Sequence, residues 1–169
     1  MRIYLIGYMG CGKSTVGKGL ADALNLQFLD LDTYIEERNF KTIPELFASE
    51  GEEGFRKAEQ KALHEVSEFE NIVIATGGGA PCFFDNLEYI KKTGTSLYLE
   101  GSPRILAERL MNSKTERPLI KGKNREELIA FIDETLAKRN NWYQKADVIM
   151  KFDHDVSTAE VLDALKGFI

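Results

Sequence analysis

The sequence predicts an α/β fold in which a parallel five-stranded sheet is covered by helices on both faces. Short apolar runs alternate with segments of helical periodicity, which is the pattern of parallel strands joined by helices. The runs span residues 2–6, 26–31, 71–75, 95–99 and 147–150. The second observation is the segment 7–14, which reads Gly-Tyr-Met-Gly-Cys-Gly-Lys-Ser. This spacing, directly after the first run, is that of a phosphate-binding loop between a strand and a helix.

The phosphate loop predicts a nucleotide site. Gly10 and Gly12 allow the backbone to turn its N–H groups inward onto phosphate oxygens. Lys13 is expected to reach the β- and γ-phosphates, and the Ser14 hydroxyl is expected to take a place on Mg²⁺. The helix that follows, with Thr15 in its first turn, adds the positive end of its dipole. An ordinary glycine turn is the alternative, which the context of a strand and a helix disfavours.

Composition limits what the rest of the chain can do. The 169 residues, 43% of them hydrophobic, suit a single domain, 1–169, built around one site. A net charge of −5 without a basic stripe argues against a nucleic-acid partner. Cys11 and Cys82 make no disulfide framework and are expected as free thiols in a reducing cytosol. Without a signal pattern or an apolar run of about 18 residues, we expect a cytoplasmic protein with no membrane contact.

Three helix starts carry local capping signals. They are the capping boxes of Thr33 with Glu36 and of Ser157 with Glu160, and the N-cap Ser102 before Pro103.

The polar and basic segment 112–124 lies between two later helical patterns and contains Pro118 and Gly122. We interpret it as a mobile lid. A plain solvated loop is the alternative interpretation.

The second apolar run ends in two carboxylates, Asp30 and Asp32. Ligands of open parallel sheets bind at the carboxyl ends of the strands, so both side chains are expected at the site. One carboxylate can hold Mg²⁺ directly or through water, while the other accepts a proton from an attacking hydroxyl. The alternative for Asp32 is that it only caps a helix.

The third run ends in Thr76 and three glycines, Gly77, Gly78 and Gly79, where a nucleotide hydrolase would carry a metal-binding aspartate. Bare backbone suits a small, oxygen-rich substrate pressed against the main chain. A simple turn is the alternative.

Two arginines add a preference for anions. Arg56 precedes Glu59 by three residues on one helical face, and Arg139 ends a long helical pattern. Each alone could be a solvated or dipole-compensating cation. Together they suggest a clamp for the carboxylate of a small metabolite, because guanidinium groups bind carboxylates through two hydrogen bonds.

These motifs together resemble the shikimate kinase family. The resemblance rests on the phosphate loop, Asp-x-Asp, Gly-Glu-x-Gly-Phe-Arg-x-x-Glu, Thr-Gly-Gly-Gly, Arg-Pro-Leu and a late Arg-Asn-x-x-Tyr, in order over nearly the whole chain. It implies the three-layer P-loop NTPase fold of nucleoside monophosphate kinases, with strand order 2-3-1-4-5, a shikimate-binding region at about 32–60 and a closing lid. The reaction implied is phosphorylation of shikimate by ATP to shikimate 3-phosphate, a step of aromatic amino-acid synthesis, by an enzyme that we expect to be a monomer.

The resemblance also implies roles for the nucleotide side. Lys13 and Ser14 would serve the ATP phosphates and Mg²⁺, with Cys11 inside the same loop, and Asp30 would support the metal through water. Arg117, in the lid, would contact the transferred phosphate. Arg109 resembles the arginine that lies against adenine.

On the acceptor side, Asp32 would hold the shikimate hydroxyl and act as the base. Arg56 and Arg139 would bind the shikimate carboxylate. The glycines 77–79 would lie along the ring hydroxyls.

The sequence departs from the family pattern at two places. Cys11 stands where relatives often carry alanine or serine, and we hypothesise that its oxidation or alkylation blocks ATP binding, because a helix N-terminus and Lys13 favour a thiolate. The segment 151–156 is not a close match to the loop that touches adenine in relatives.

Two other functions stay open at this stage. A kinase for another small hydroxy acid such as gluconate shares the phosphate loop and the chain length. A non-catalytic nucleotide-binding module or GTPase switch is the other, although the sequence lacks DxxG after the third run and any Asn-Lys-x-Asp motif.

Overall fold

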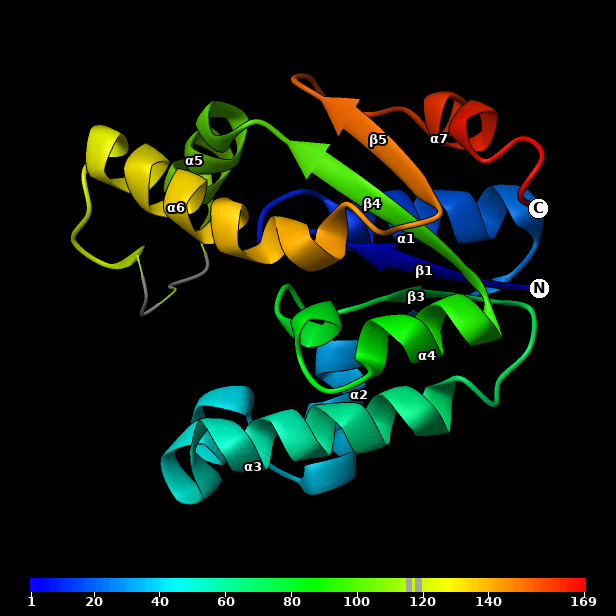
Figure 1. The fold of residues 1–169 in the computed structure, drawn as a ribbon, viewed down its shortest axis with the longest axis horizontal. Coiled ribbons are helices and arrows are strands. Elements are labelled where there is room, and N and C mark those ends of the chain that lie inside the picture. The colour runs from blue at the N-terminus through cyan, green and yellow to red at the C-terminus, as the bar shows by residue number, and fades with distance from the viewer. Residues whose placement is uncertain (115–116, 118–119) are drawn as a thin grey trace.

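A computed structural model describes residues 1–114, 117 and 120–169 of the chain. Over these residues the fold is a three-layer α/β sandwich around a five-stranded sheet in the order β2-β3-β1-β4-β5 (Figure 1). All four strand pairings are parallel, as predicted. The strands are β1 (Arg2–Ile6), β2 (Gln27–Asp30), β3 (Ile72–Ala75), β4 (Thr95–Gly101) and β5 (Val148–Phe152).

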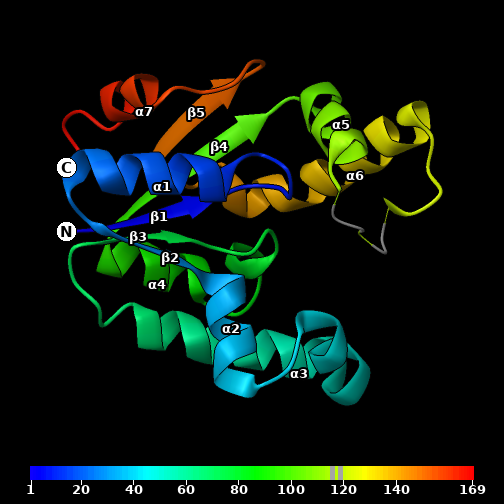
Figure 2. The ribbon, with the colours of Figure 1, turned by 180° about the vertical axis from the view of Figure 1, so that it is seen from behind.

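Helices cover both faces of this sheet. Helices α1 and α7 pack together on one face, and α4 and α6 lie on the other (Figures 1 and 2). The helices are α1 (Lys13–Leu24), α2 (Leu31–Asn39), α3 (Ile43–Val66), α4 (Asn86–Thr93), α5 (Pro103–Asn112), α6 (Arg125–Tyr143) and α7 (Thr158–Ala164), with a 3₁₀ turn η1 (Ala80–Cys82). Both chain ends lie at the amino ends of the strands. They therefore lie on the side opposite the carboxyl ends, where open parallel sheets bind their ligands.

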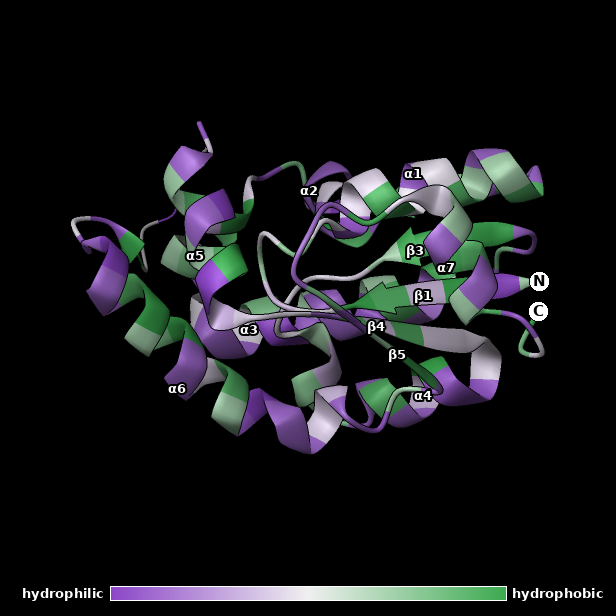
Figure 3. Ribbon diagram, turned by 90° about the horizontal axis from the view of Figure 1, so that it is seen from above, coloured by the Kyte–Doolittle hydropathy of each residue, from purple (hydrophilic) through white to green (hydrophobic). Residues whose placement is uncertain are grey.

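The core lies in the middle of the sheet. Residues 3–6 of β1 and 72–75 of β3 are buried, and both strands are mostly green in the hydropathy view (Figure 3). Strands buried on both faces are continuously apolar because neither face meets water. The two central strands therefore hold the loops at their carboxyl ends, the phosphate loop and the glycine turn, in fixed positions.

The capping predictions were correct at two of the three helix starts. Ser157 and Glu160 form a full capping box, and the Ser102 side chain accepts from the Ile105 amide. The predicted box at Thr33 is wrong, because α2 starts three residues earlier than a Thr33 N-cap requires and its N-cap is Asp30, which accepts from the Thr33 amide at 3.2 Å.

Helix α3 is bent at Gly51, whose φ of 72° is outside the helical region. Glycine adopts this left-handed conformation without a steric penalty.

Across the part of the chain that the structure describes, none of the helices has the length and apolar character needed to cross a membrane.

Candidate active site

The phosphate loop follows β1 and ends where α1 begins. Gly7, Gly10 and Gly12 have positive φ angles of 149°, 80° and 94°, which side chains rarely tolerate. A Cβ at Gly7 would in addition lie 2.8 Å from the Leu99 carbonyl oxygen. Lys13 Nζ donates to the Gly7 carbonyl at 2.6 Å and thus lies folded along the loop. The glycines at these positions are therefore required by the backbone path, as the motif predicted.

The two oxygen groups expected at Mg²⁺ meet beside this loop. Ser14 Oγ donates to Asp30 Oδ2 at 2.9 Å, while the other carboxylate oxygen of Asp30 caps α2. Hydroxyl and carboxylate oxygens suit Mg²⁺, which keeps several waters and substrate phosphates as ligands. Accordingly, no group of three or more His, Cys, Asp or Glu side chains that could hold a metal occurs among the described residues. The residues present thus fit a magnesium ion held mostly by nucleotide and water.

Asp32 is the second residue of α2 and lines the same cavity as the phosphate loop. This cavity of about 270 Å³ is lined by Lys13, Asp30, Asp32, the first two glycines of the triple and Arg117, among others. Burial raises the pKa of Asp32, the negative charge of Asp30 raises it further, and Lys13 opposes the shift. A carboxylate whose pKa is raised is a stronger base and is suited to accept a proton.

The charged side chains of the site lie close to three consecutive glycines that follow β3. A Cβ on Gly77 would lie 2.9 Å from Asp32 Oδ1, and one on Gly78 would lie 3.1 Å from Arg139 Nη1. A Cβ on Gly79 would lie 2.7 Å from Arg56 Nη2. Each glycine thus leaves room for a charged group, and Gly77 also leaves room for Glu59, whose Oε2 would lie 3.1 Å from the added Cβ. The turn brings together charged residues from three distant parts of the sequence.

Arg56 is held from two sides. Its Nη1 donates to Glu59 Oε1 at 2.9 Å, and its guanidinium lies 4.1 Å from the centre of the Phe83 ring. Glu59 is 1% exposed, and burial raises its pKa to about 6 against the opposing effect of Arg56. The Nε atom of Arg56 is buried without a hydrogen-bond partner and lies 3.8 Å from Glu52 Oε1, with which it forms an ion pair. Carboxylates and an aromatic ring therefore hold the cation in place.

Arg139 lies in α6, four residues before the last residue of that helix, Tyr143. Its Nη1 donates to Tyr143 Oη at 3.2 Å, and its guanidinium lies 5.4 Å from the centre of the Tyr8 ring. Tyr143 in turn donates to the Gly78 carbonyl oxygen. Since Arg56 and Arg139 flank neighbouring glycines, the predicted pair of guanidinium groups does converge on one turn.

The predicted lid is only partly described, because positions 115, 116, 118 and 119 lie outside the described residues. Arg117 lines the cavity together with Lys13, and its Nε is buried without a hydrogen-bond partner. The proline and leucine of the Arg-Pro-Leu motif fall on the undescribed positions.

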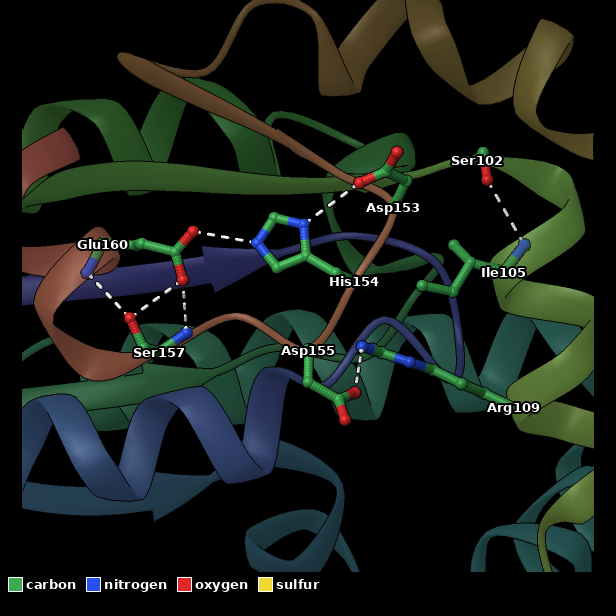
Figure 4. Close-up of polar contacts among 8 residues, drawn as sticks. All are labelled: Ser102, Ile105, Arg109, Asp153, His154, Asp155, Ser157 and Glu160. Atoms are coloured by element: carbon green, nitrogen blue, oxygen red, sulfur yellow. Dashed lines mark hydrogen bonds and ion pairs between the residues drawn. The ribbon is translucent and has the colours of Figure 1, made fainter.

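Arg109 lies against the phosphate loop, where its Nη1 donates to the Gly10 carbonyl oxygen at 3.4 Å. Its Nη2 forms an ion pair with Asp155 at 3.0 Å (Figure 4). Its guanidinium lies 4.9 Å from the centre of the Phe152 ring. In the same loop His154 bridges Asp153 and Glu160. The segment 151–156 therefore contacts Arg109 despite its poor match to the family pattern, and the contact of Arg109 with adenine stays a prediction.

Comparison with known proteins places this site in a family. A family model described as shikimate kinase matches residues 9–169 of the chain. The chain belongs to the shikimate kinase family. It is 51% identical to shikimate kinase of Parabacteroides distasonis over 162 residues, which cover 96% of this chain and 94% of that protein.

Solved structures of shikimate kinases agree with this assignment. The chain superposes on shikimate kinase from Bacteroides thetaiotaomicron with a TM-score of 0.90 at 48% identity, covering 98% of this chain and 94% of that one. Shikimate kinase from Acinetobacter baumannii in complex with shikimate gives a TM-score of 0.81 at 36% identity, covering 98% and 89%. A gluconokinase from Sinorhizobium meliloti gives 0.58 at 20% identity, covering 96% and 87%, and so shares the fold alone.

Membership of the family confirms the P-loop kinase fold and strand order that the motifs implied. It also makes the chain a kinase that uses ATP, which decides against a GTPase switch or a module without catalysis.

Cys11 is less accessible to solvent than the hypothesis of a reactive thiol requires. Its side chain is buried, 2% exposed, and its sulfur lies 3.7 Å from Lys13 Nζ. This burial shields the thiol from reagents, and the hypothesis that its modification blocks ATP binding stays a prediction.

Two residues of the site were not predicted as functional from the sequence. Tyr143 belongs to the late Arg-Asn-x-x-Tyr motif, and this motif could have indicated a role for it. Phe83, which packs on Arg56, follows the 3₁₀ turn and carries no such signal.

Proposed function

We propose that this protein transfers the γ-phosphoryl group of ATP to the 3-hydroxyl of shikimate, giving ADP and shikimate 3-phosphate. The observation that carries the proposal is the convergence of the Asp32 carboxylate and two guanidinium groups on the three glycines 77–79. Shikimate combines a carboxylate with ring hydroxyls, and this arrangement offers a partner for each.

In the acceptor half of the reaction, Arg56 and Arg139 hold the carboxylate of shikimate. The ring then lies along the glycine turn, where no side chain blocks it. Asp32 accepts the proton of the 3-hydroxyl as the new O–P bond forms to the γ-phosphorus. The bond between that phosphorus and the β,γ-bridging oxygen breaks, and ADP leaves with the electron pair.

In the nucleotide half, the backbone of the loop and Lys13 hold the phosphates, and Arg117 neutralises charge on the transferred group. Ser14, with Asp30 through water, would hold Mg²⁺, which when bound neutralises charge on the phosphate oxygens. Arg109 lies against the adenine. Closure of the segment 112–124 as a lid would exclude water and so prevent hydrolysis of ATP.

We further propose that the enzyme acts in the cytosol as a monomer that binds small molecules alone. The two free cysteines suit a reducing compartment. The acidic net charge of −5 disfavours a nucleic-acid partner.

A coupled ADP-release assay with Mg·ATP and a panel of acceptors tests the proposal. The panel comprises shikimate, quinate, gluconate and nucleoside monophosphates. Turnover is expected with shikimate alone. Turnover with gluconate and none with shikimate would show a kinase whose substrate is not shikimate. The absence of turnover with every acceptor would reject the proposed reaction.

A further inference from the structure

Tyr143, the last residue of α6, lies between two parts of the site, and the proposed reaction gives it no role. Its side chain is fully buried, at 0% exposed. The hydroxyl donates to the Gly78 carbonyl oxygen and accepts from Arg139 Nη1 at 3.2 Å. One hydroxyl therefore joins the glycine turn that faces the substrate ring to the arginine that faces its carboxylate.

The ring and the hydroxyl of Tyr143 have separate tasks. The ring packs against Tyr98 with centroids 4.8 Å apart and planes at 35°, a tilted geometry common among aromatic pairs in cores. A phenylalanine would keep this packing. Burial raises the pKa of the Tyr143 hydroxyl, so it stays a neutral group that can donate one hydrogen bond and accept another.

The Tyr143 hydroxyl accepts the side-chain hydrogen bond that Arg139 donates. Across the described residues Arg139 forms no ion pair, in contrast to Arg56, which has Glu59 at 2.9 Å. The face of the Tyr8 ring also lies near the Arg139 guanidinium, and an aromatic face attracts a cation without fixing the direction of its N–H groups. Binding a carboxylate by two parallel hydrogen bonds requires that direction to be fixed.

We propose that Tyr143 is a positioning residue for shikimate: its hydroxyl holds the Arg139 guanidinium and the Gly78 turn in one geometry, so that the carboxylate and ring subsites keep their spacing. This inference rests on the proposed function. It adds a residue that touches neither substrate, and it assigns the role to the hydroxyl rather than to the ring.

Substitution of Tyr143 by phenylalanine removes the hydroxyl and retains the ring. The KM for shikimate is expected to rise about tenfold, because a hydrogen bond to a charged group is lost and Arg139 is freed. The KM for ATP is expected to change by less than about twofold, since the variant leaves the phosphate loop intact.

Tyr98→Phe is the matched control. It removes the hydroxyl from the other ring of the same buried pair, and within the part of the chain that the structure describes Tyr98 forms no hydrogen bond with Arg139 or with the glycine turn. Its KM for shikimate is expected to equal that of the wild type. Arg139→Ala supplies a background in which Tyr143→Phe should raise KM by less than about threefold, because interacting residues are not additive.

The wild type, measured in the same assay, separates the two proposals. No turnover of shikimate by the wild type would reject the proposed function itself. With an active wild type, an unchanged shikimate KM in Tyr143→Phe would overturn the positioning role, as would an equal rise in the Arg139→Ala background. Failure of Tyr143→Phe to fold while Tyr98→Phe folds would assign the hydroxyl to stability and would also overturn it.

Discussion

Replacement of Gly79 by alanine perturbs the site by the addition of a single methyl group. Gly79 has φ −88° and ψ −10°, which any residue can adopt, so the backbone tolerates the change. The added Cβ would lie 2.7, 2.8 and 3.0 Å from Nη2, Nη1 and Cζ of Arg56. These separations are well inside the roughly 3.5 Å at which nonbonded heavy atoms attract best. The guanidinium therefore has to move.

Arg56 cannot move without losing contacts. Its Nη1 is bonded to the buried Glu59 at 2.9 Å, and the Phe83 ring lies against its guanidinium. Truncating one partner of a buried charge pair costs about 2–5 kcal/mol, and a displaced arginine that keeps its charge belongs at the lower end. About 2 kcal/mol corresponds to a rise of about 30-fold in the KM for shikimate.

The assay is steady-state kinetics with shikimate and ATP varied in turn. The KM for ATP should stay at its wild-type value, because Gly79 faces the acceptor side. In an Arg56→Ala background the added methyl meets no guanidinium, so Gly79→Ala should then have little further effect. An unchanged shikimate KM, or the same increase with and without Arg56, would refute the reasoning.

Three further predictions follow from the same geometry. Asp32→Asn should lower kcat by about 100- to 10,000-fold while ATP still binds in calorimetry, because the proton acceptor is lost; normal turnover would remove that role. Arg139→Ala should weaken shikimate binding by about 2–5 kcal/mol, and a change in ATP affinity alone would contradict the clamp. Glu59, with a pKa raised from 4.5 to about 6, binds more protons folded than unfolded, so its contribution to stability is full below pH 4.5 and falls by about 2 kcal/mol as the pH rises past 6. Urea unfolding should show this loss relative to Glu59→Gln, and a difference independent of pH would contradict it.

The sequence predicted the elements of the fold well because its strands are continuous apolar runs with clear ends. The predicted run 71–75 and the observed β3 (Ile72–Ala75) differ by one residue. The start of α2 was harder to predict, since both Asp30 and Thr33 can cap a helix. Leu31 is 0% exposed, and its burial as the first helical residue makes Asp30 the N-cap. That burial is a tertiary effect that local capping patterns do not contain.

The types of site residue were predictable, but their partnerships were not. Arg56 and Arg139 were recognised as a candidate clamp from residue chemistry. That each faces a separate glycine of one turn depends on the packing of α3 and α6 around the end of β3. The role of Tyr143 also arises there, because its bond to Gly78 joins residues 65 positions apart.

The position of the phosphate on the product tests the central claim most directly. If the two arginines hold the carboxylate and Asp32 faces the reacting hydroxyl, shikimate binds in one orientation. Two-dimensional ¹H–³¹P NMR of the purified product should then show the phosphorus coupled to the proton on carbon 3 alone. Coupling to the proton on carbon 4 or 5 would show that shikimate binds in another orientation and would contradict the assignment of the site.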